Sequence, residues 1–342
     1  MLTYFVHRVL VMIPTLLVIS ILTFVIIQLP PGDYLSNHME ELRSQGESAS
    51  ALAKIEFYRV QYALDKSPLE QYARWMGFWP GPDGFSGLLQ GDWGQSFAYN
   101  LPVKEVVGDR LGLSFLINFS TILFIYIVAF PIGVYSATRQ YSIGDYGFTL
   151  IGYLGLATPN FLLAMVLLYY ANVYFGISIG GLMDDKYINQ PWSFEKAKSV
   201  FDHMLIPVIV IGTSGTAAMI RRLRANLLDE LQKQYVTTAR AKGVPQLRAL
   251  IKYPIRMSLN PFVADIGSLL PDVISGSVIV SMVLSLPTVG PLLLEALRNQ
   301  DQYMAGSLLM FLALLTVVGM FLSDILLAML DPRIRLSGGA TK

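Results

Sequence analysis

The sequence predicts an all-α membrane protein with six transmembrane helices and both termini in the cytoplasm. Of its 342 residues, 54% are hydrophobic and only 14% are charged, whereas soluble domains carry about 25% charged residues. The mean hydropathy is +0.51. Six separate stretches are apolar for the ~20 residues that a helix needs to cross a bilayer. Basic residues gather on one side of these stretches, which gives the orientation.

The apolar stretches define the expected spans in order along the chain. They are Val9 to Leu29, Leu113 to Ala137, Phe148 to Tyr174, Met204 to Ile220, Leu259 to Leu286 and Tyr303 to Leu330. The first follows His7 and Arg8 in the manner of a secretory signal. It is longer than the apolar region of a signal peptide, about 7–15 residues, and no A-x-A cleavage site follows it, so we interpret it as a retained helix. Pro159 predicts a kink in the third span.

The orientation follows from the positive-inside rule. With the N-terminus inside, the cytoplasmic segments hold most of the basic residues and few acidic ones. The basic residues are Arg8, Arg139, Arg221, Arg222, Arg224, Lys233, Arg240, Lys242, Arg248, Lys252, Arg256, Arg333, Arg335 and Lys342, and the acidic ones are Asp145, Asp229, Glu230 and Asp331. An even number of spans then places both termini in the cytoplasm.

A long external segment separates the first two spans. Residues 31–110 exceed a simple connector, and they contain a helical pattern from Ala51 to Met76 and a turn-rich piece from Gly77 to Gly94. We expect a small external (periplasmic) loop subdomain. All four tryptophans fall on the external side, where they serve either as interfacial anchors or as contacts for an external protein.

A basic insert, Tyr235 to Pro261, lies between the fourth and fifth spans. The pattern predicts one helix that starts near Asp229 or Glu230 and runs to Lys242, with acid at its positive end and base at its negative end. Gly243 is placed to end it in a left-handed conformation, and Pro245 to begin a second short helix. The alternative is a plain positive-inside loop, but such a loop needs no ordered stop and restart.

The fifth expected span carries a polar stripe. Asp265 and Asp272 are seven residues apart on one helical face, with Ser268 and Ser275 near it. A carboxylate at mid-bilayer costs about 2.5–3.5 kcal/mol, so these acids should face protein or water. One interpretation is that they line a translocation pathway and meet ammonium groups or sugar hydroxyls. The other is a structural pair with a neighbouring span or subunit. Asp324, near the inner end of the last span, is interpreted as a structural residue that pairs with an arginine of the Arg221 cluster, which consists of Arg221, Arg222 and Arg224.

Several kinds of chemistry find no support in the chain. Cysteine is absent, which excludes disulfides, thiolate metal sites and cysteine nucleophiles. The three histidines, His7, His38 and His203, are scattered, so we expect no metal site and no cofactor. No GxxxxGK[ST] nucleotide-binding loop occurs. A net charge of +1 argues against a nucleic-acid partner.

Six motifs in a fixed order carry a family resemblance. They are Pro31-Gly32-Asp33, LDKSPLEQY (Leu64 to Tyr72), GDWGQS (Gly91 to Ser96), YVTTARAKG (Tyr235 to Gly243), SLPTVGPLL (Ser285 to Leu293) and DPRIRL (Asp331 to Leu336). Together they resemble the membrane subunits of dipeptide, oligopeptide and nickel ABC importers, specifically the first of the two paired permeases. The resemblance extends over essentially the whole chain.

This resemblance implies a heterodimer with a second homologous permease in the bacterial inner membrane. Two ABC ATPase subunits would bind from inside, and a periplasmic or lipid-anchored solute-binding protein would deliver substrate from outside. The chain would be a transport subunit and not an enzyme. Its ATPase-coupling residues would be Tyr235, Thr238, Ala239, Arg240, Ala241, Lys242, Gly243 and Val244. The implied organisation is an N-terminal helix (1–30), a periplasmic loop subdomain (31–110) and a five-helix core (111–342) with its cytoplasmic coupling loop at about 225–258.

One departure from the family leaves the substrate open. Where many relatives have Gly-Ala-Val-Val-Val-Glu in the fifth span, this chain has Gly276, Ser277, Val278, Ile279, Val280 and Ser281 and lacks the glutamate. Peptides are the first expectation, and oligosaccharides or glycosides carried by the same architecture are the alternative. From a different class, a self-sufficient secondary transporter predicts internal repeats with matching broken helices, which the chain does not display.

Overall fold

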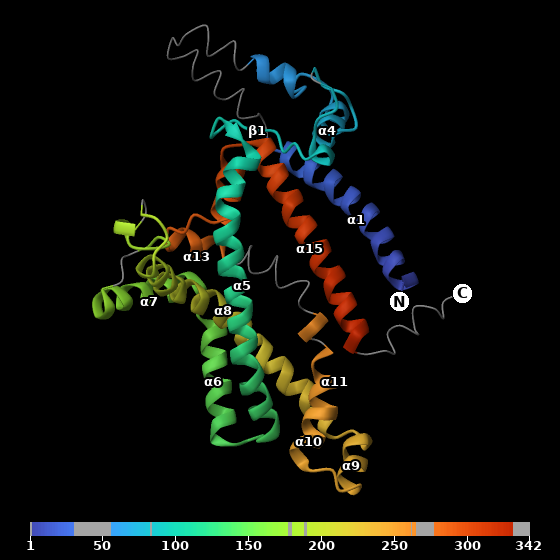
Figure 1. Ribbon diagram of the computed structural model, residues 1–342, viewed down its shortest axis with the longest axis vertical. Coiled ribbons are helices and arrows are strands. Elements are labelled where there is room, and N and C mark those ends of the chain that lie inside the picture. The colour runs from blue at the N-terminus through green and yellow to red at the C-terminus, as the bar shows by residue number, and fades with distance from the viewer. Residues whose placement is uncertain are drawn as a thin grey trace. The chain divides into compact units, whose positions relative to one another are not determined.

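The structure is a computed structural model that describes residues 2–30, 56–82, 84–176, 180–187, 190–260, 262–264 and 277–330. Helices make up most of these residues (Figure 1). The chain forms two compact units. The first unit contains Met1–Leu10, Leu113–Pro287 and Leu315–Lys342, and the second contains Val11–Gly112 and Thr288–Leu314.

Four helices are long and apolar enough to cross a membrane. They are α1 (Leu2–Gln28), α5 (Val103–Thr138), α8 (Phe194–Leu231) and α15 (Gln302–Leu330). Each contains one of the stretches expected from the sequence, so these four helix predictions are confirmed in place and type. Residues 261 and 265–276 of the fifth expected span lie outside the described residues, which resume at Ser277 before the short helix α13 (Val278–Val283).

The third expected span is a broken pair of helices. α6 (Ile143–Ala157) and α7 (Asn160–Phe175) meet at an angle of 104°, so the change of direction expected at Pro159 is present, as a break between two helices. Thr158 has extended backbone angles, φ −85° and ψ 123°, as expected for the residue before a proline. Pro159 then starts α7. Counting this pair as one span gives up to five candidate spans.

The first unit is built around α8. α6 packs antiparallel to it: Asp145 lies against Arg224, Gly152 against Ala217, and Gly155 against Thr213. α5 approaches the same helix through the glycines of α8, because a Cβ at Gly212 or Gly215 would lie within 2.7 Å of α5 side-chain atoms. One face of α7, with Ala164, Leu168 and Ala171, is buried in an apolar cluster that also contains Val210 and Ile211 of α8.

The second unit packs the segment between α1 and α5 against apolar residues of these two helices and of α15. It contains α4 (Pro68–Met76), the short 3-10 turn Leu88–Gln90, β1 (Gln95–Ser96) paired antiparallel with β2 (Leu101–Pro102), and α14 (Val289–Arg298). Residues 56–61 are also helical. Its core includes Phe24, Val107, Leu292 and Met304. Trp75 belongs to this core and is only 4% exposed, so it is a packing residue and not an interfacial anchor.

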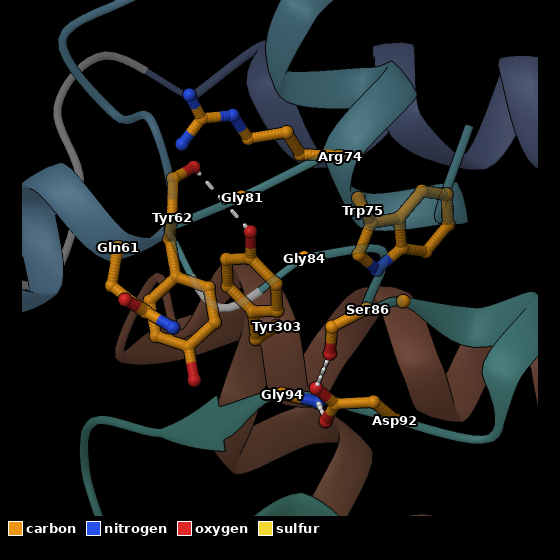
Figure 2. A pocket seen from close by; sticks show the side chains of 11 residues that line it. Gln61, Tyr62, Arg74, Trp75, Gly81, Gly84, Ser86, Asp92, Gly94 and Tyr303 are labelled. Atoms are coloured by element: carbon orange, nitrogen blue, oxygen red, sulfur yellow. Dashed lines mark hydrogen bonds between the residues drawn. The ribbon is translucent and has the colours of Figure 1, made fainter. Parts of the chain in front are cut away.

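A small cavity lies inside the second unit (Figure 2). Tyr62, Trp75 and Tyr303 line it. The Tyr303 hydroxyl donates to the Tyr62 carbonyl oxygen at 3.5 Å, and Ser86 donates to the Asp92 carboxylate. Its volume of about 60 Å³ has room for a few water molecules, whereas ligand sites commonly have 300–1,000 Å³. We assign it to the packing of the unit.

The remaining elements follow α7 and α8 in the first unit. A 3-10 turn (Asp185–Tyr187) precedes α8, and α9 (Gln234–Ala241), α10 (Gln246–Leu250), a π-helical turn (Ile251–Ile255) and α11 (Arg256–Ser258) follow it.

Candidate functional site: the α9–α10 segment

The basic insert predicted from the sequence forms two short helices directly after α8. α8 ends at Leu231, Gln232 and Lys233 form the break, and α9 begins at Gln234. Asp229 and Glu230 therefore lie in the last turn of α8, so the expectation that they begin the next helix was wrong. Leu227 explains the longer α8, since it is fully buried and its packing favours helix through this turn.

Gly243 ends α9 as the sequence predicted. Its φ is +75°, a left-handed conformation that costs other residues energy. The Gly243 N–H donates to the Arg240 carbonyl at 2.9 Å, and the Val244 N–H donates to the Ala239 carbonyl at 3.2 Å. These two bonds form a Schellman motif. Pro245 then precedes the first residue of α10, so the predicted stop and restart are both confirmed.

The two faces of α9 differ sharply in exposure. Val236 and Ala239 are buried, at 2% and 7% exposed, and Ala249 of α10 is 1% exposed. The outward residues are Tyr235, Thr238, Arg240, Ala241, Lys242 and Gly243, with Val244 half-buried. Ala239, one of the coupling residues that the resemblance implies, therefore packs inward on the buried face of α9. Leu247, at 68% exposed, adds an apolar side chain next to the cations.

Tyr235 is held against the end of α8. Its hydroxyl donates to the Glu230 carboxylate, and its ring lies 6.3 Å from that of Tyr253. Partial burial and the acceptor Glu230 raise the pKa of the Tyr235 phenol above its ordinary value. The phenol therefore stays protonated and keeps donating this hydrogen bond. In this way the start of α9 is tied to both the preceding helix and the following turn.

An ion pair anchors the helix that carries this segment. The Arg224 guanidinium of α8 donates to both carboxylate oxygens of Asp145 on α6, at 2.9 and 2.8 Å. Asp145 is 2% exposed. In the sequence both residues are only expected cytoplasmic charges, and no spacing rule connects positions 79 residues apart. Asp324 pairs with Arg8 at 3.1 Å, so the expected pairing with the Arg221 cluster was wrong.

The predicted pathway residues Asp265, Ser268, Asp272 and Ser275 lie outside the described residues. In the described part of the chain, no group of three or more potential ligand side chains could hold a metal ion. The described residues thus combine long apolar helices with an exposed basic segment from α9 to α10. This arrangement defines a class of protein, a helical membrane protein with several candidate spans.

Comparison with known proteins identifies the family. Residues 129–336 match the model of the "Binding-protein-dependent transport system inner membrane component". This is more than half of the chain, and the chain belongs to that family. It is thus an inner-membrane, multi-pass permease subunit of a binding-protein-dependent ABC importer, and a transport subunit rather than an enzyme. Membership removes the secondary-transporter alternative.

Named relatives match over nearly their whole length. The oligopeptide transport system permease protein AppB of Bacillus subtilis is 33% identical, with 98% of this chain and 99% of AppB covered. The dipeptide transport system permease protein DppB of Escherichia coli is 27% identical, with 98% and 99% covered. The nickel import system permease protein NikB of Staphylococcus aureus is 25% identical, with 98% and 93% covered.

Proposed function

We propose that the chain forms half of a translocation pathway for small peptides. Support comes from the relatives, because the names of the oligopeptide and dipeptide permeases describe peptide cargo. Oligosaccharides remain the second candidate on the ground that Ser281 stands where many relatives have glutamate. Binding measurements on the cognate solute-binding protein, with peptides against oligosaccharides, test this choice of substrate.

The proposed assembly is the one that the sequence implies. A second homologous permease completes the pathway, a periplasmic or lipid-anchored solute-binding protein docks outside, and two ATPase subunits dock inside. Six spans place both termini in the cytoplasm and residues 31–110 in the periplasm. The positive-inside distribution of Lys and Arg supports this orientation.

We propose further that α9 and α10 couple the permease to an ATPase subunit. The observation that carries this proposal is the Schellman stop at Gly243 on a helix with one buried and one exposed face. Val236 and Ala239 fix α9 to its own chain. The exposed residues of α9 then contact a partner without any further ordering of the backbone. A displacement of α9 by the partner is therefore transmitted to α8.

Replacing Gly243 with valine tests the coupling. A β-branched residue at φ +75° loses roughly 1–2 kcal/mol, while a Cβ there would meet no atom within 4 Å, so the change acts on the backbone alone. We expect roughly tenfold slower uptake with normal membrane insertion. Gly176→Val is the matched control, because Gly176 also ends a helix, with φ +64° and no atom within 4 Å of a Cβ.

The comparison of the two variants decides the assignment. ATP-driven uptake in proteoliposomes and co-purification of the ATPase subunits are measured for each. Unchanged uptake with normal ATPase co-purification in Gly243→Val would contradict coupling through α9. Equal loss in Gly176→Val would point to general strain instead.

We also propose that Asp265, Ser268, Asp272 and Ser275 line the pathway. Their spacing on one helical face and the cost of an acid in lipid support this. Asp272→Asn should then change uptake and leave assembly intact, as measured by transport and by co-purification of the second permease. Loss of assembly with Asp272→Asn would favour a structural pair.

A further inference from the structure

A second candidate site lies between α6 and α8. The two helices enclose a cavity of about 220 Å³ whose walls are mainly aromatic and aliphatic, with Phe148, Leu156 and Ile220 among them. Gly152 contributes no side chain to the wall, and a Cβ there would still lie 3.7 Å from Ala217. The volume is below that of sites that enclose a whole drug-sized ligand. It suits one apolar chain of a larger molecule.

One end of this cavity carries an uncompensated positive charge. Asp145, Arg221 and Arg224 all line it. Asp145 and Arg224 neutralise each other through their two-pronged ion pair. The exposed guanidinium of Arg221 has no hydrogen bond or ion pair to any residue that the structure describes. The cavity therefore joins an apolar wall to a cation that is available to an anion.

The charged end lies where the membrane interface is expected. Arg221 directly follows the apolar stretch of α8 from Met204 to Ile220. Tyr141, Tyr146 and Tyr153 around the cavity are 68%, 61% and 55% exposed, and tyrosines are enriched at bilayer interfaces.

The outer face of α6 continues the apolar surface away from the cavity. Leu150, Ile151 and Leu154 are 61%, 66% and 59% exposed. In a membrane-spanning chain such side chains face lipid tails or another apolar helix. The cavity is therefore continuous with a surface that an acyl chain can reach from the bilayer.

We propose that this cavity binds an anionic phospholipid. The phosphate contacts Arg221, whose planar guanidinium matches phosphate oxygens, and one acyl chain lies along Gly152 and Leu156. Basic pockets between membrane helices at the interface are suited to anionic headgroups. A free phosphate would leave the apolar wall in water, so the lipid accounts for both ends of the cavity. The proposal rests on membrane insertion and not on the coupling role of α9.

Lipid counting on the intact importer complex tests the proposal. The purified complex is titrated with phosphatidylglycerol or with phosphatidylcholine of the same acyl chains, and bound lipids are counted by native mass spectrometry. We expect the wild type to prefer phosphatidylglycerol about fivefold, the effect of one cation near an anionic surface. Arg221→Gln should abolish this preference. Arg222→Gln, which removes the same charge one residue away and outside the cavity lining, should retain it.

A second variant tests the apolar end. Gly152→Leu fills the cavity without changing charge and should lower the retention of both lipids, while glycerol 3-phosphate should not displace bound phosphatidylglycerol. Co-purification of the ATPase subunits checks that each variant assembles. If Arg221→Gln fails to assemble, the lipid retention of Gly152→Leu tests the proposal. The proposal is overturned by equal effects of Arg221→Gln and Arg222→Gln, by unchanged lipid retention in Gly152→Leu, or by displacement with glycerol 3-phosphate.

Discussion

Two buried carboxylates, Asp145 and Asp301, are accommodated in different ways. Asp145 faces the Arg224 guanidinium, so its charge is balanced directly. Asp301 is 1% exposed and accepts hydrogen bonds from the Ser96 hydroxyl at 2.7 Å and from the Ala98 and Met304 N–H groups at 3.2 Å. These bonds tie the β1–β2 hairpin to the start of α15. Burial nevertheless raises the pKa of the Asp301 carboxyl, while its hydrogen bonds oppose the rise.

The raised pKa of Asp301 predicts a pH dependence with a definite sign. Below about pH 4 the carboxyl is protonated in both folded and unfolded chains. As the pH rises, the unfolded chain loses the proton first, so the folded state holds more protons and loses stability until the pH passes the folded pKa. Thermal unfolding of the purified complex should show the wild type losing stability relative to Asp301→Asn from about pH 4 upward.

The control for Asp301 is the same change at an exposed acid. Asp109→Asn on α5 removes the same charge at an exposed position and is measured in parallel. A difference between wild type and Asp301→Asn that stays constant with pH would contradict the expected titration.

At the scale of elements, the lengths of the apolar stretches predicted where helices occur, but not how the helices bend or which residues they contact. α1, α5, α8 and α15 contain the expected stretches because any ~20 apolar residues must hydrogen-bond internally in lipid. The proline signal located the break at Pro159, but the 104° bend depends on what α7 packs against. Likewise the partner of Asp324 is Arg8, a contact between residues remote in sequence that only tertiary structure reveals.

The contact of α6 with α8 predicts different tolerance at two neighbouring glycines. A Cβ at Gly155 would lie 2.7 Å from Thr213 Cγ2, whereas a Cβ at Gly152 meets nothing closer than 3.7 Å. Thr213 is stiff at χ1 and its hydroxyl donates to the Ile209 carbonyl, so it yields poorly. Gly155→Ala should destabilise by about 1–3 kcal/mol relative to Gly152→Ala, measured as thermal unfolding of the purified complex. Equal stabilities would mean that α6 moves freely on α8.

At the scale of the whole molecule, the sequence motifs identified the family, and the structure added long-range packing. The Gly243 stop follows from glycine chemistry and could be placed from the sequence alone. α14, with its buried Leu292, packs into the same unit as the segment between α1 and α5. No local sequence signal predicts this contact, because the apolar face of α14 resembles that of any amphipathic helix. The burial of Ala239 could not be predicted for the same reason, since a small residue gives no sign of which face of a helix it occupies.

The absence of cysteine allows the proposed topology to be tested with single cysteines. Phe85, Tyr141, Phe194 and Leu247 are 63%, 68%, 82% and 68% exposed, and each lies outside the apolar stretches that are expected to cross the membrane. If α6 and α7 together cross the membrane once, a membrane-impermeant maleimide should label Phe85→Cys and Phe194→Cys in intact spheroplasts. Tyr141→Cys and Leu247→Cys should require permeabilisation.

A re-entrant α6–α7 pair predicts a different labelling pattern. The chain would return to the side of Tyr141, so Phe194→Cys would join the protected group and Leu247→Cys would be labelled from outside. That pattern would remove the α9–α10 segment from the side where an ATPase could reach it. Uptake activity retained by each single-cysteine variant is the control for native insertion. The labelling of position 194 therefore decides both the number of spans and whether α9 is available for coupling.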